Sequence, residues 1–439
     1  MLSKKRISPF ELNQVLGANY VILTLKFDGK DTVKDTVEKL KDEIIGLNLR
    51  LEGNYLVRRK KEDIQVHQLP PSSNFDSIYS MTSWASTKYL PKFKHEMGTI
   101  SCNDDTIILN LNHAICDGKY IAGVAHHIGD PLVKPTNSYF PITLDEEFKS
   151  EVEERLTKPP SFFRNDRNNT IFHDFGMEKT PTELLYDEFY DTKTFSNYDS
   201  KKKICKNLTS AIVTGYCLSA MALQGDTEIT HIGGSMACDM RNELRNKKIN
   251  HIENIFHQNS PYNRDRNDPN DPITLNHTNI FAVCPITAKI SPDTKINECY
   301  SRLNQCLRRH FDSNKEDLFD YRSTMGKENP EDVSNGIMIC YSNLGPIRVK
   351  KPVKDLYLYN MCINRAFDFA IPLLTYAIID ESNDRNEFHS QVRYEGNGLT
   401  GKQAITLSKS LKHYLQTFNG NSTLEEALKD IKAFQKSLD

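Results

Sequence analysis

The stretch NLNHAICDGKY, residues 110–120, joins a strand pattern to a helix pattern and carries a histidine and an acid at the junction. The run TIILNLNH, residues 106–113, has the apolar spacing of a strand. From Asp117 the segment DGKYIAGVAHHIGD has the spacing of a helix that begins at the acid, with Gly129 as its stop. The sequence therefore predicts that His113 lies at the end of a strand and Asp117 at the start of a helix.

His113 in this position is a candidate general base. An imidazole held at a strand end can exchange a proton at neutral pH, because its unperturbed pKa is about 6.5. Asp117 could orient the imidazole, or it could point away and brace the loop, and the helix start at Gly118 favours the brace. There is no G-x-S-x-G elbow, and Cys116 adjoins an acid, which raises a thiol pKa. We expect direct transfer without a covalent enzyme intermediate; the competing interpretation is a purely structural core histidine.

Length and composition exclude several classes of protein. A chain of 439 residues exceeds the usual size of one hydrophobic core, so two domains or two halves are expected. The 56 Lys and Arg residues balance 58 Asp and Glu residues, which argues against nucleic-acid binding or a basic membrane surface. No apolar stretch is long enough for a signal or a membrane span, so we expect a soluble, cytoplasmic protein. The ten cysteines lack zinc-site spacing, and we expect buried free thiols and no metal.

Helix and strand patterns alternate along the chain, which predicts an α/β or α+β architecture. We divide it into an N-terminal half, 1–175, and a C-terminal half, 176–439, with a crossover at 130–190 that is poor in apolar periodicity. Helices are predicted at 8–16, 31–51, 144–157, 207–223, 296–311, 401–418 and 423–437. Further strands are predicted at 19–29, 54–58, 64–67, 228–244, 279–290, 334–347 and 388–399.

The segment NHAICDG resembles the H-x-x-x-D-G motif of the CoA-dependent acyltransferase superfamily, which includes chloramphenicol acetyltransferase, peptide-synthetase condensation domains, plant BAHD acyltransferases and fungal alcohol acetyltransferases. The order of the elements along the chain is similar as well. The resemblance implies two mixed-sheet halves, each like chloramphenicol acetyltransferase, with a shared active-site tunnel.

Two later segments extend the resemblance. ACDMRNEL, residues 237–244, is similar to a D-x-R segment whose arginine pairs with the motif aspartate, which implies a salt bridge between Asp117 and Arg241 across the halves. The competing interpretation of this segment is a surface turn. YSNLGPI, residues 341–347, resembles an S-N-x-G stretch near the tunnel. There Ser342 or Asn343 could stabilise the oxyanion of a tetrahedral intermediate, or the segment could simply form a turn.

The chain also departs from parts of the superfamily. Condensation domains and chloramphenicol acetyltransferase usually carry a second histidine directly before the catalytic one, whereas this chain has Asn112. That difference favours the alcohol acetyltransferase and BAHD branches. The BAHD element D-F-G-W-G has only a coincidental counterpart, DFGME at 174–178, in the expected crossover.

The resemblance implies an acyl-CoA-dependent O-acyltransferase, with acetyl-CoA as the co-substrate and a small-molecule alcohol as the acceptor. His113 would be the general base, Asp117 and Gly118 would shape its loop, and a monomer is expected. Two alternatives stay open. One is an amide-forming or carrier-protein-dependent condensation enzyme that takes an amine acceptor; the other is a catalytically silent binding homologue.

Overall fold

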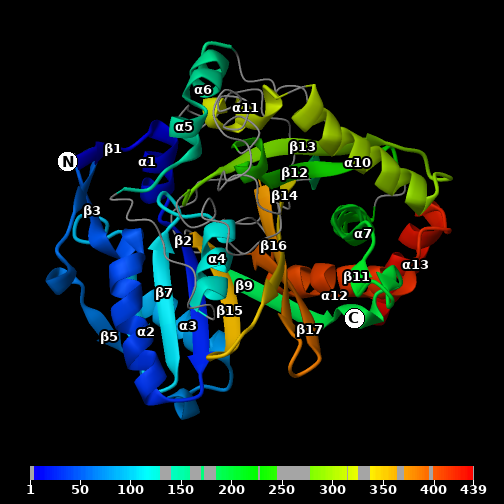
Figure 1. Cartoon of the computed structure of the whole chain (residues 1–439). Coiled ribbons are helices and arrows are strands. Elements are labelled where there is room, and N and C mark those ends of the chain that lie inside the picture. Colours follow the sequence, from blue (N-terminus) through cyan, green and yellow to red (C-terminus); the bar gives the residue numbers. More distant parts are fainter. Residues whose placement is uncertain are drawn as a thin grey trace. The chain divides into compact units, whose positions relative to one another are not determined.

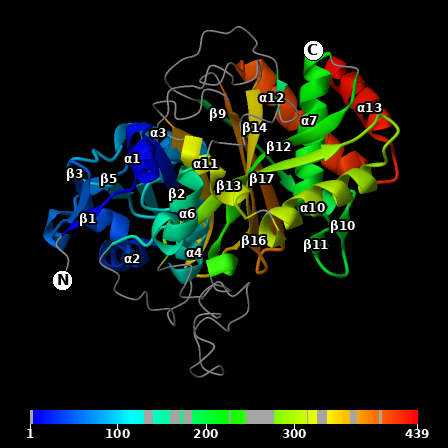
Figure 2. The same ribbon diagram turned by 90° about the horizontal axis from the view of Figure 1, so that it is seen from above.

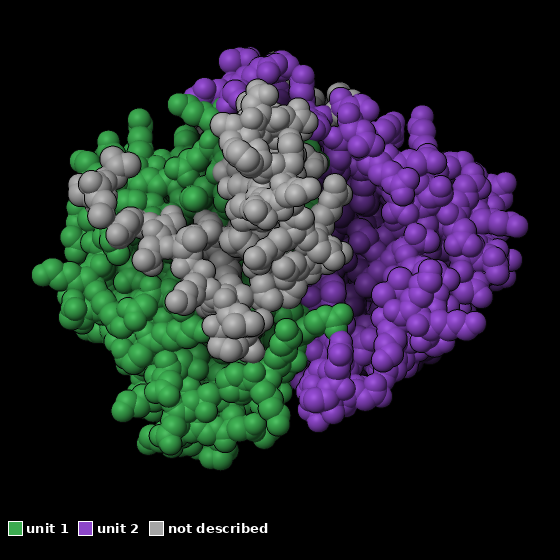
Figure 3. Space-filling view, viewed as in Figure 1, with its two compact units in different colours: residues 1–149, 239–281, 347–366 green, residues 150–238, 282–346, 367–439 purple. Residues whose placement is uncertain are grey.

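The computed structural model describes residues 4–128, 140–158, 170–172, 184–225, 228–244, 277–313, 315–324, 337–362, 370–394 and 399–438. The chain divides into two compact units, which are coloured separately in Figure 3. Unit 1 comprises 1–149, 239–281 and 347–366, and unit 2 comprises 150–238, 282–346 and 367–439. The boundary expected at 175 lies outside the described residues. Two segments of the expected C-terminal half, 239–281 and 347–366, thus belong to unit 1.

Unit 1 contains a five-stranded mixed sheet with the order β15-β2-β7-β6-β5. These strands are β2 (Asn19–Phe27), β5 (Val66–Gln68), β6 (Gly98–Cys102), β7 (Thr106–Asn112) and β15 (Val353–Cys362). The predicted strand β7 pairs antiparallel with β2, where Tyr20 faces Asn112, and antiparallel with β6. Every residue of β7 is buried. Neighbours on both edges therefore hold the strand that leads to His113.

Helices cover both faces of this sheet (Figure 2). α3 (Ile78–Lys88) lies on one face, and α2 (Lys30–Glu43) and α4 (Gly118–Ile128) lie on the other. Unit 1 also contains α1 (Pro9–Leu16), α5 (Leu144–Glu147) and a three-stranded sheet of β1 (Lys4–Arg6), β4 (Tyr55–Arg58) and β3 (Leu49–Glu52). Short 3₁₀ turns occur at η1 (Ile45–Asn48), η2 (Lys61–Asp63) and η3 (Ser72–Asn74). The expected opening helix, α1, begins with a capping box of Ser8 and Glu11.

The helix predicted at 31–51 is too long. α2 ends at Glu43, and Ile44 is extended, with φ −84° and ψ 101°. Beyond that point the apolar residues Leu47, Leu49 and Leu51 recur at every second position, which is the period of a strand. A side chain at Gly46 would place its Cβ 2.3 Å from Ile115 Cδ1. The residues just after the end of α2 therefore pack closely against the loop that follows β7.

Unit 2 contains a seven-stranded sheet with the order β13-β12-β14-β16-β17-β9, and β8 also pairs with β14. The strands are β8 (Thr170–Phe172), β9 (Leu184–Asp191), β12 (His231–Asp239), β13 (Phe281–Lys289), β14 (Ile337–Arg348), β16 (Ala370–Asp380) and β17 (Arg385–Tyr394). β12 and β14 are parallel, whereas β17 is antiparallel to both β16 and β9. The expectation that 130–190 is only a crossover is wrong for β9, which pairs along its whole length with β17.

The helices of unit 2 are α6 (Lys149–Leu156), α7 (Leu208–Gln224), α10 (Ile296–Asp312), α11 (Asp317–Thr324), α12 (Gly401–Thr417) and α13 (Leu424–Ser437). Smaller elements are η4 (Thr192–Thr194), β10 (Tyr198–Asp199) and β11 (Ile204–Cys205). α7 is buried from Ser210 to Met221, and α10, α12 and α13 pack around it (Figure 1). At Gly215 an added Cβ would lie 2.3 Å from Tyr414 Cδ1, so the backbones of α7 and α12 approach closely.

In the part of the chain that the structure describes, no helix has both the length and the apolar character needed to cross a bilayer. The same residues contain no group of His, Cys, Asp or Glu side chains suited to a metal ion.

A buried histidine in unit 2 is held between two carboxylates. His389 Nδ1 lies 2.9 Å from Asp187 Oδ2, and its Nε2 lies 2.9 Å from Glu387 Oε1. The ring stacks on Tyr376 with a centroid separation of 4.7 Å. Burial alone would lower the pKa of His389, but the two carboxylates raise it to about 9.

This arrangement predicts a pH-dependent stability. The pKa of His389 is about 9 in the folded state and about 6.5 in the unfolded state. The contribution of His389 to the free energy of unfolding is therefore complete below about pH 6.5 and is lost as the pH rises to about 9. We expect the difference in free energy of unfolding between wild type and His389→Gln to shrink as pH rises through this window. Urea denaturation at several pH values measures it. A difference that does not change with pH would contradict the assignment.

Candidate functional site

The loop after β7 is held by the backbone and by the side chain of Asn112. His113 N–H donates to Asn19 O at 2.8 Å, so pairing with the neighbouring chain continues one residue past the strand. Asn112 Oδ1 then accepts from Ala114 N–H at 2.9 Å, and Asn112 O accepts from Ile115 N–H at 3.1 Å. An amide side chain that bonds to the backbone two residues later stabilises a tight turn. Asn112, noted in the sequence only as a departure, thus shapes the turn that carries His113.

Asp117 joins the loop to α4 and to a distant segment. Its Oδ1 accepts from Tyr120 N–H at 2.8 Å, as an N-cap residue does at the start of a helix. Its Oδ2 accepts from Ile280 N–H at 2.8 Å, and its own N–H donates to Thr278 O at 2.8 Å. Both carboxylate oxygens therefore hold backbone, which is the geometry of a brace.

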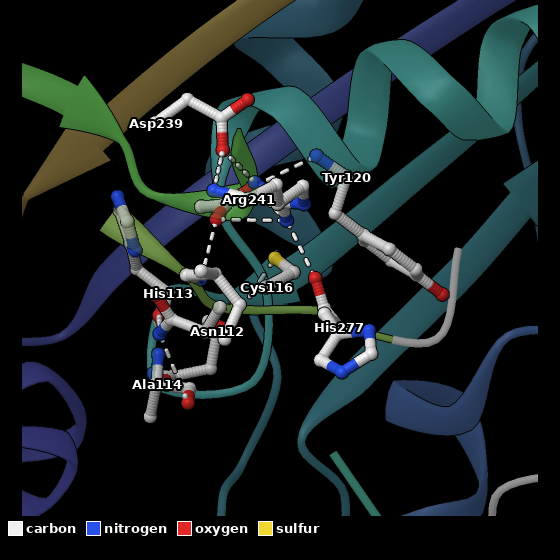
Figure 4. Close-up of polar contacts among 11 residues, drawn as sticks. Asn112, His113, Ala114, Cys116, Tyr120, Asp239, Arg241 and His277 are labelled. Atoms are coloured by element: carbon white, nitrogen blue, oxygen red, sulfur yellow. Dashed lines mark hydrogen bonds and ion pairs between the residues drawn. The ribbon is translucent and has the colours of Figure 1, made fainter. Parts of the chain in front are cut away.

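Arg241 lies against the same carboxylate. Its Nη2 is 3.0 Å from each oxygen of Asp117. The same Nη2 donates to His277 O at 2.5 Å (Figure 4). Its Nη1 donates to Asp239 Oδ1 at 2.9 Å. Arg241 is 2% exposed and Asp117 is 3% exposed, so both charges are buried. Burial opposes the charged guanidinium, but Asp117 and Asp239 together raise the pKa of Arg241 above its usual value.

The pair lies within unit 1, because segment 239–281 belongs to that unit. The ion pair expected between Asp117 and Arg241 is therefore present, and it joins a residue of 1–175 to a residue of 176–439 that both lie in one compact unit. β12 ends at Asp239, and residues 241–244 are helical, whereas a strand was expected there. Asp239 Oδ1 accepts from Arg241 N–H at 3.1 Å, which turns the chain at this point.

The segment before β13 supplies contacts to His113 that the sequence did not reveal. Asn279 Nδ2 donates to His113 O at 2.7 Å and to Ala114 O at 3.2 Å. The Phe281 ring lies 5.2 Å from the imidazole, centroid to centroid, and 5.7 Å from the Phe10 ring. In sequence Asn279 and Phe281 stand only at the start of the predicted strand 279–290. The signal that identifies them is their contact with the loop, which exists only in the folded chain.

The neighbouring thiol is poorly suited to act as a nucleophile. Cys116 is buried, and its Sγ lies 3.6 Å from Asn112 O. Burial, with a further contribution from Asp117, raises the pKa of the Cys116 thiol well above its ordinary value. Because the thiolate is the reactive form, the imidazole is the better suited of the two for proton transfer.

Ser342 and Asn343 lie on β14 in unit 2. The Asn343 amide is engaged at both ends: Nδ2 donates to Thr209 Oγ1 at 3.3 Å, and Oδ1 accepts from Gly345 N–H at 3.0 Å. Gly345 has φ +73°, a conformation that favours glycine. Asn343 Oδ1 thus bonds to the backbone two residues later, as amide side chains do in tight turns. An oxyanion role for Ser342 or Asn343 stays a prediction.

No protein-family model matches this sequence, and no curated protein matches it. Solved structures match it over nearly its whole length. Polyketide synthase associated protein 5 from Mycobacterium tuberculosis aligns with a TM-score of 0.59 and 11% identity, covering 94% of this chain and 97% of that one.

Two further matches are domains of peptide synthetases. The starter condensation domain of rhizomide synthetase, in complex with C8-CoA and Leu-SNAC, aligns with a TM-score of 0.63 and 9% identity over 96% of each chain. The epimerization domain from the third module of tyrocidine synthetase B aligns with a TM-score of 0.62 and 10% identity, over 99% of this chain and 98% of that one.

Identities this low show the fold and nothing finer. The chain has the mixed α/β fold of condensation domains, which confirms the fold class expected from the H-x-x-x-D-G resemblance. The closer relation to the alcohol acetyltransferase and BAHD branches stays a prediction.

The buried ion pair yields a prediction about stability. Arg241→Met would leave Asp117 as a buried, uncompensated carboxylate, which costs about 3–5 kcal/mol. We expect the free energy of unfolding, measured by urea denaturation, to fall by that amount. The matched control is Arg50→Met, because Arg50 pairs with Glu52 on the surface, where such pairs contribute about 0–1 kcal/mol. Equal losses in the two variants would refute a special role for Arg241.

Proposed function

We propose that the protein transfers an acyl group from a thioester to a nucleophilic acceptor, with His113 as the general base. The observation that carries the proposal is the way the chain holds this histidine. Its N–H is bonded to Asn19 and its carbonyl to Asn279, and four residues later the loop is tied down by the Asp117–Arg241 pair. A base fixed through its backbone keeps its position while its ring exchanges a proton.

The proposed reaction has two stages. The imidazole of His113 takes the proton of the acceptor hydroxyl as the acceptor oxygen attacks the thioester carbonyl carbon. The tetrahedral intermediate then collapses, the carbon–sulfur bond breaks, and the imidazolium returns the proton to the departing thiolate. The developing oxyanion needs a preorganised donor. Ser342 and Asn343 stay the proposed donors, and of the two the amide of Asn343 already contacts Thr209 and Gly345.

We infer that the donor is an acyl-CoA, with acetyl as the first group to test. The structure of the rhizomide synthetase starter condensation domain contains C8-CoA, which supports a CoA thioester as the donor class for this fold. Asn112 in place of a second histidine supports an alcohol as the acceptor. We further propose that the protein acts as a monomer on a small-molecule acceptor.

A condensation-type reaction is the second candidate, and the structural matches favour it. They include condensation and epimerization domains of peptide synthetases. In this version an amine attacks a thioester carried by a phosphopantetheine arm, and His113 has the same role. The two candidates differ in donor and acceptor but not in the base.

The first test is a thiol-release assay with acetyl-CoA, longer acyl-CoAs and a carrier-bound acyl thioester, each offered with alcohols and amines. We expect turnover with at least one pair and a loss of about 10²–10⁴-fold in kcat for His113→Ala, the range expected for removal of a general base. His67→Ala is the matched control, since His67 lies on the edge strand β5 and stacks on Tyr89.

The outcomes separate the candidates. Release from a CoA donor with an alcohol supports the O-acyltransferase, and release only from the carrier with an amine supports the condensation-type enzyme. Absence of thiol release from every donor would overturn both and leave the silent binding homologue. Circular dichroism of His113→Ala establishes that a loss of turnover is not a loss of folding.

Asn279 yields a separate prediction, as a positioning residue. Asn279→Asp keeps the shape of the side chain but removes the N–H group that holds His113 O. Because small displacements of a base reduce the rate steeply, we expect kcat to fall about 10–100-fold with little change in KM. Steady-state kinetics measure both constants. An unchanged kcat, or a loss confined to KM, would show that Asn279 does not position the base.

A further inference from the structure

A second cluster of nucleophile, base and acid lies in unit 2. Cys306 and His310 are four residues apart on α10, and Cys306 Sγ lies 3.7 Å from His310 Nε2. His310 Nδ1 lies 3.0 Å from Asp317 Oδ2, at the start of α11. A thiol, an imidazole and a carboxylate in this order form the arrangement that activates cysteine nucleophiles. All three residues lie outside the site of His113.

The sulfur of Cys306 also lies beside the edge strand of the sheet that the described residues of unit 2 form. β13 is the outermost strand in the order of the seven-stranded sheet. Thr287 N–H of this strand donates to Cys306 Sγ at 3.5 Å. The thiol of Cys306 in turn donates to Pro285 O at 3.8 Å. An anionic sulfur here would receive hydrogen bonds from a backbone amide and from a charged imidazole. The site thus supplies two donors to a thiolate.

Electrostatics distinguish Cys306 from another cysteine on the same helix. Burial raises the pKa of Cys306, but the contacts with His310 and Thr287 outweigh it, so the net shift is downward. The pKa of His310 is raised to about 9 despite burial, by Asp317 and Cys306. Cys299 lies seven residues earlier and contacts Thr214 Oγ1 at 3.6 Å; burial raises its pKa to about 11.

We propose that Cys306 is a site of oxidative modification, at which hydrogen peroxide converts a thiolate held by His310 and Thr287 into a sulfenic acid. The sulfur attacks one peroxide oxygen, the oxygen–oxygen bond breaks, and the departing hydroxide takes a proton from the His310 imidazolium to form water. The sulfur is oxidised and the peroxide is reduced. Because Cys306 is 5% exposed, only a small reagent such as peroxide reaches it.

The test exposes the full-length protein to hydrogen peroxide, removes the peroxide, and then unfolds the protein in denaturant that contains dimedone, so that the dimedone reaches every sulfenic acid that has formed. Mass spectrometry then quantifies the adducts at each cysteine. We expect an adduct at Cys306 that forms at least about tenfold faster than at Cys299, since each unit of pKa changes the thiolate fraction about tenfold. His310→Gln should reduce the Cys306 adduct about tenfold by removing the charged donor. Asp317→Asn, a second variant, should reduce it as well while leaving the imidazole in place.

A purely structural role for the cluster gives a different result. If Cys306 only fills the edge of β13, its adduct is absent or forms as slowly as that at Cys299, and either result overturns the proposal. An adduct that is unchanged in both His310→Gln and Asp317→Asn also overturns it. The ultraviolet absorbance of the thiolate, in wild type minus Cys306→Ser at neutral pH, provides a readout independent of access by dimedone. No difference in that absorbance would likewise contradict a resident thiolate.

Discussion

The buried ion pair of Asp117 and Arg241 is the interaction on which the site of unit 1 depends. It draws together the loop after β7, the turn after β12 and the segment before β13. Removing two charges from water is costly, and the cost is offset here because each oxygen of the carboxylate also accepts a backbone N–H. The ion pair and these hydrogen bonds therefore fix the position of Asp117, and Asp117 ends the loop that carries the backbone of His113.

In this site the residues that hold the backbone in place differ from the residue proposed to react. Asp117, Arg241 and Asn279 hold backbone, whereas the ring of His113 lies against the aromatic ring of Phe281. Such a division suits the direct acyl transfer that we propose, in which the base must take a proton and return it without moving. The Cys306 cluster of unit 2 has the opposite design: there the charged contacts act on the reactive atom itself.

Several elements could be predicted from local pattern, and the failures have identifiable causes. β7 and α4 were predicted because their apolar spacing is regular and Asp117 caps the helix. The helix predicted at 31–51 was too long, because its last residues change to the period of a strand and pack at Gly46. β9 was missed because its burial depends on pairing with β17, about 200 residues away in the chain, and no local period reports such pairing.

The sequence by itself determined the strand, the turn and the helix around His113, because these follow from residues close together in the chain. It also indicated the fold class, through the order of motifs. Only the tertiary structure decided that Asn279 and Phe281 approach His113 and that Arg241 belongs to the same unit. The physical reason is that hydrogen bonds and burial between distant segments form only when the whole unit folds, so no short window of sequence contains them.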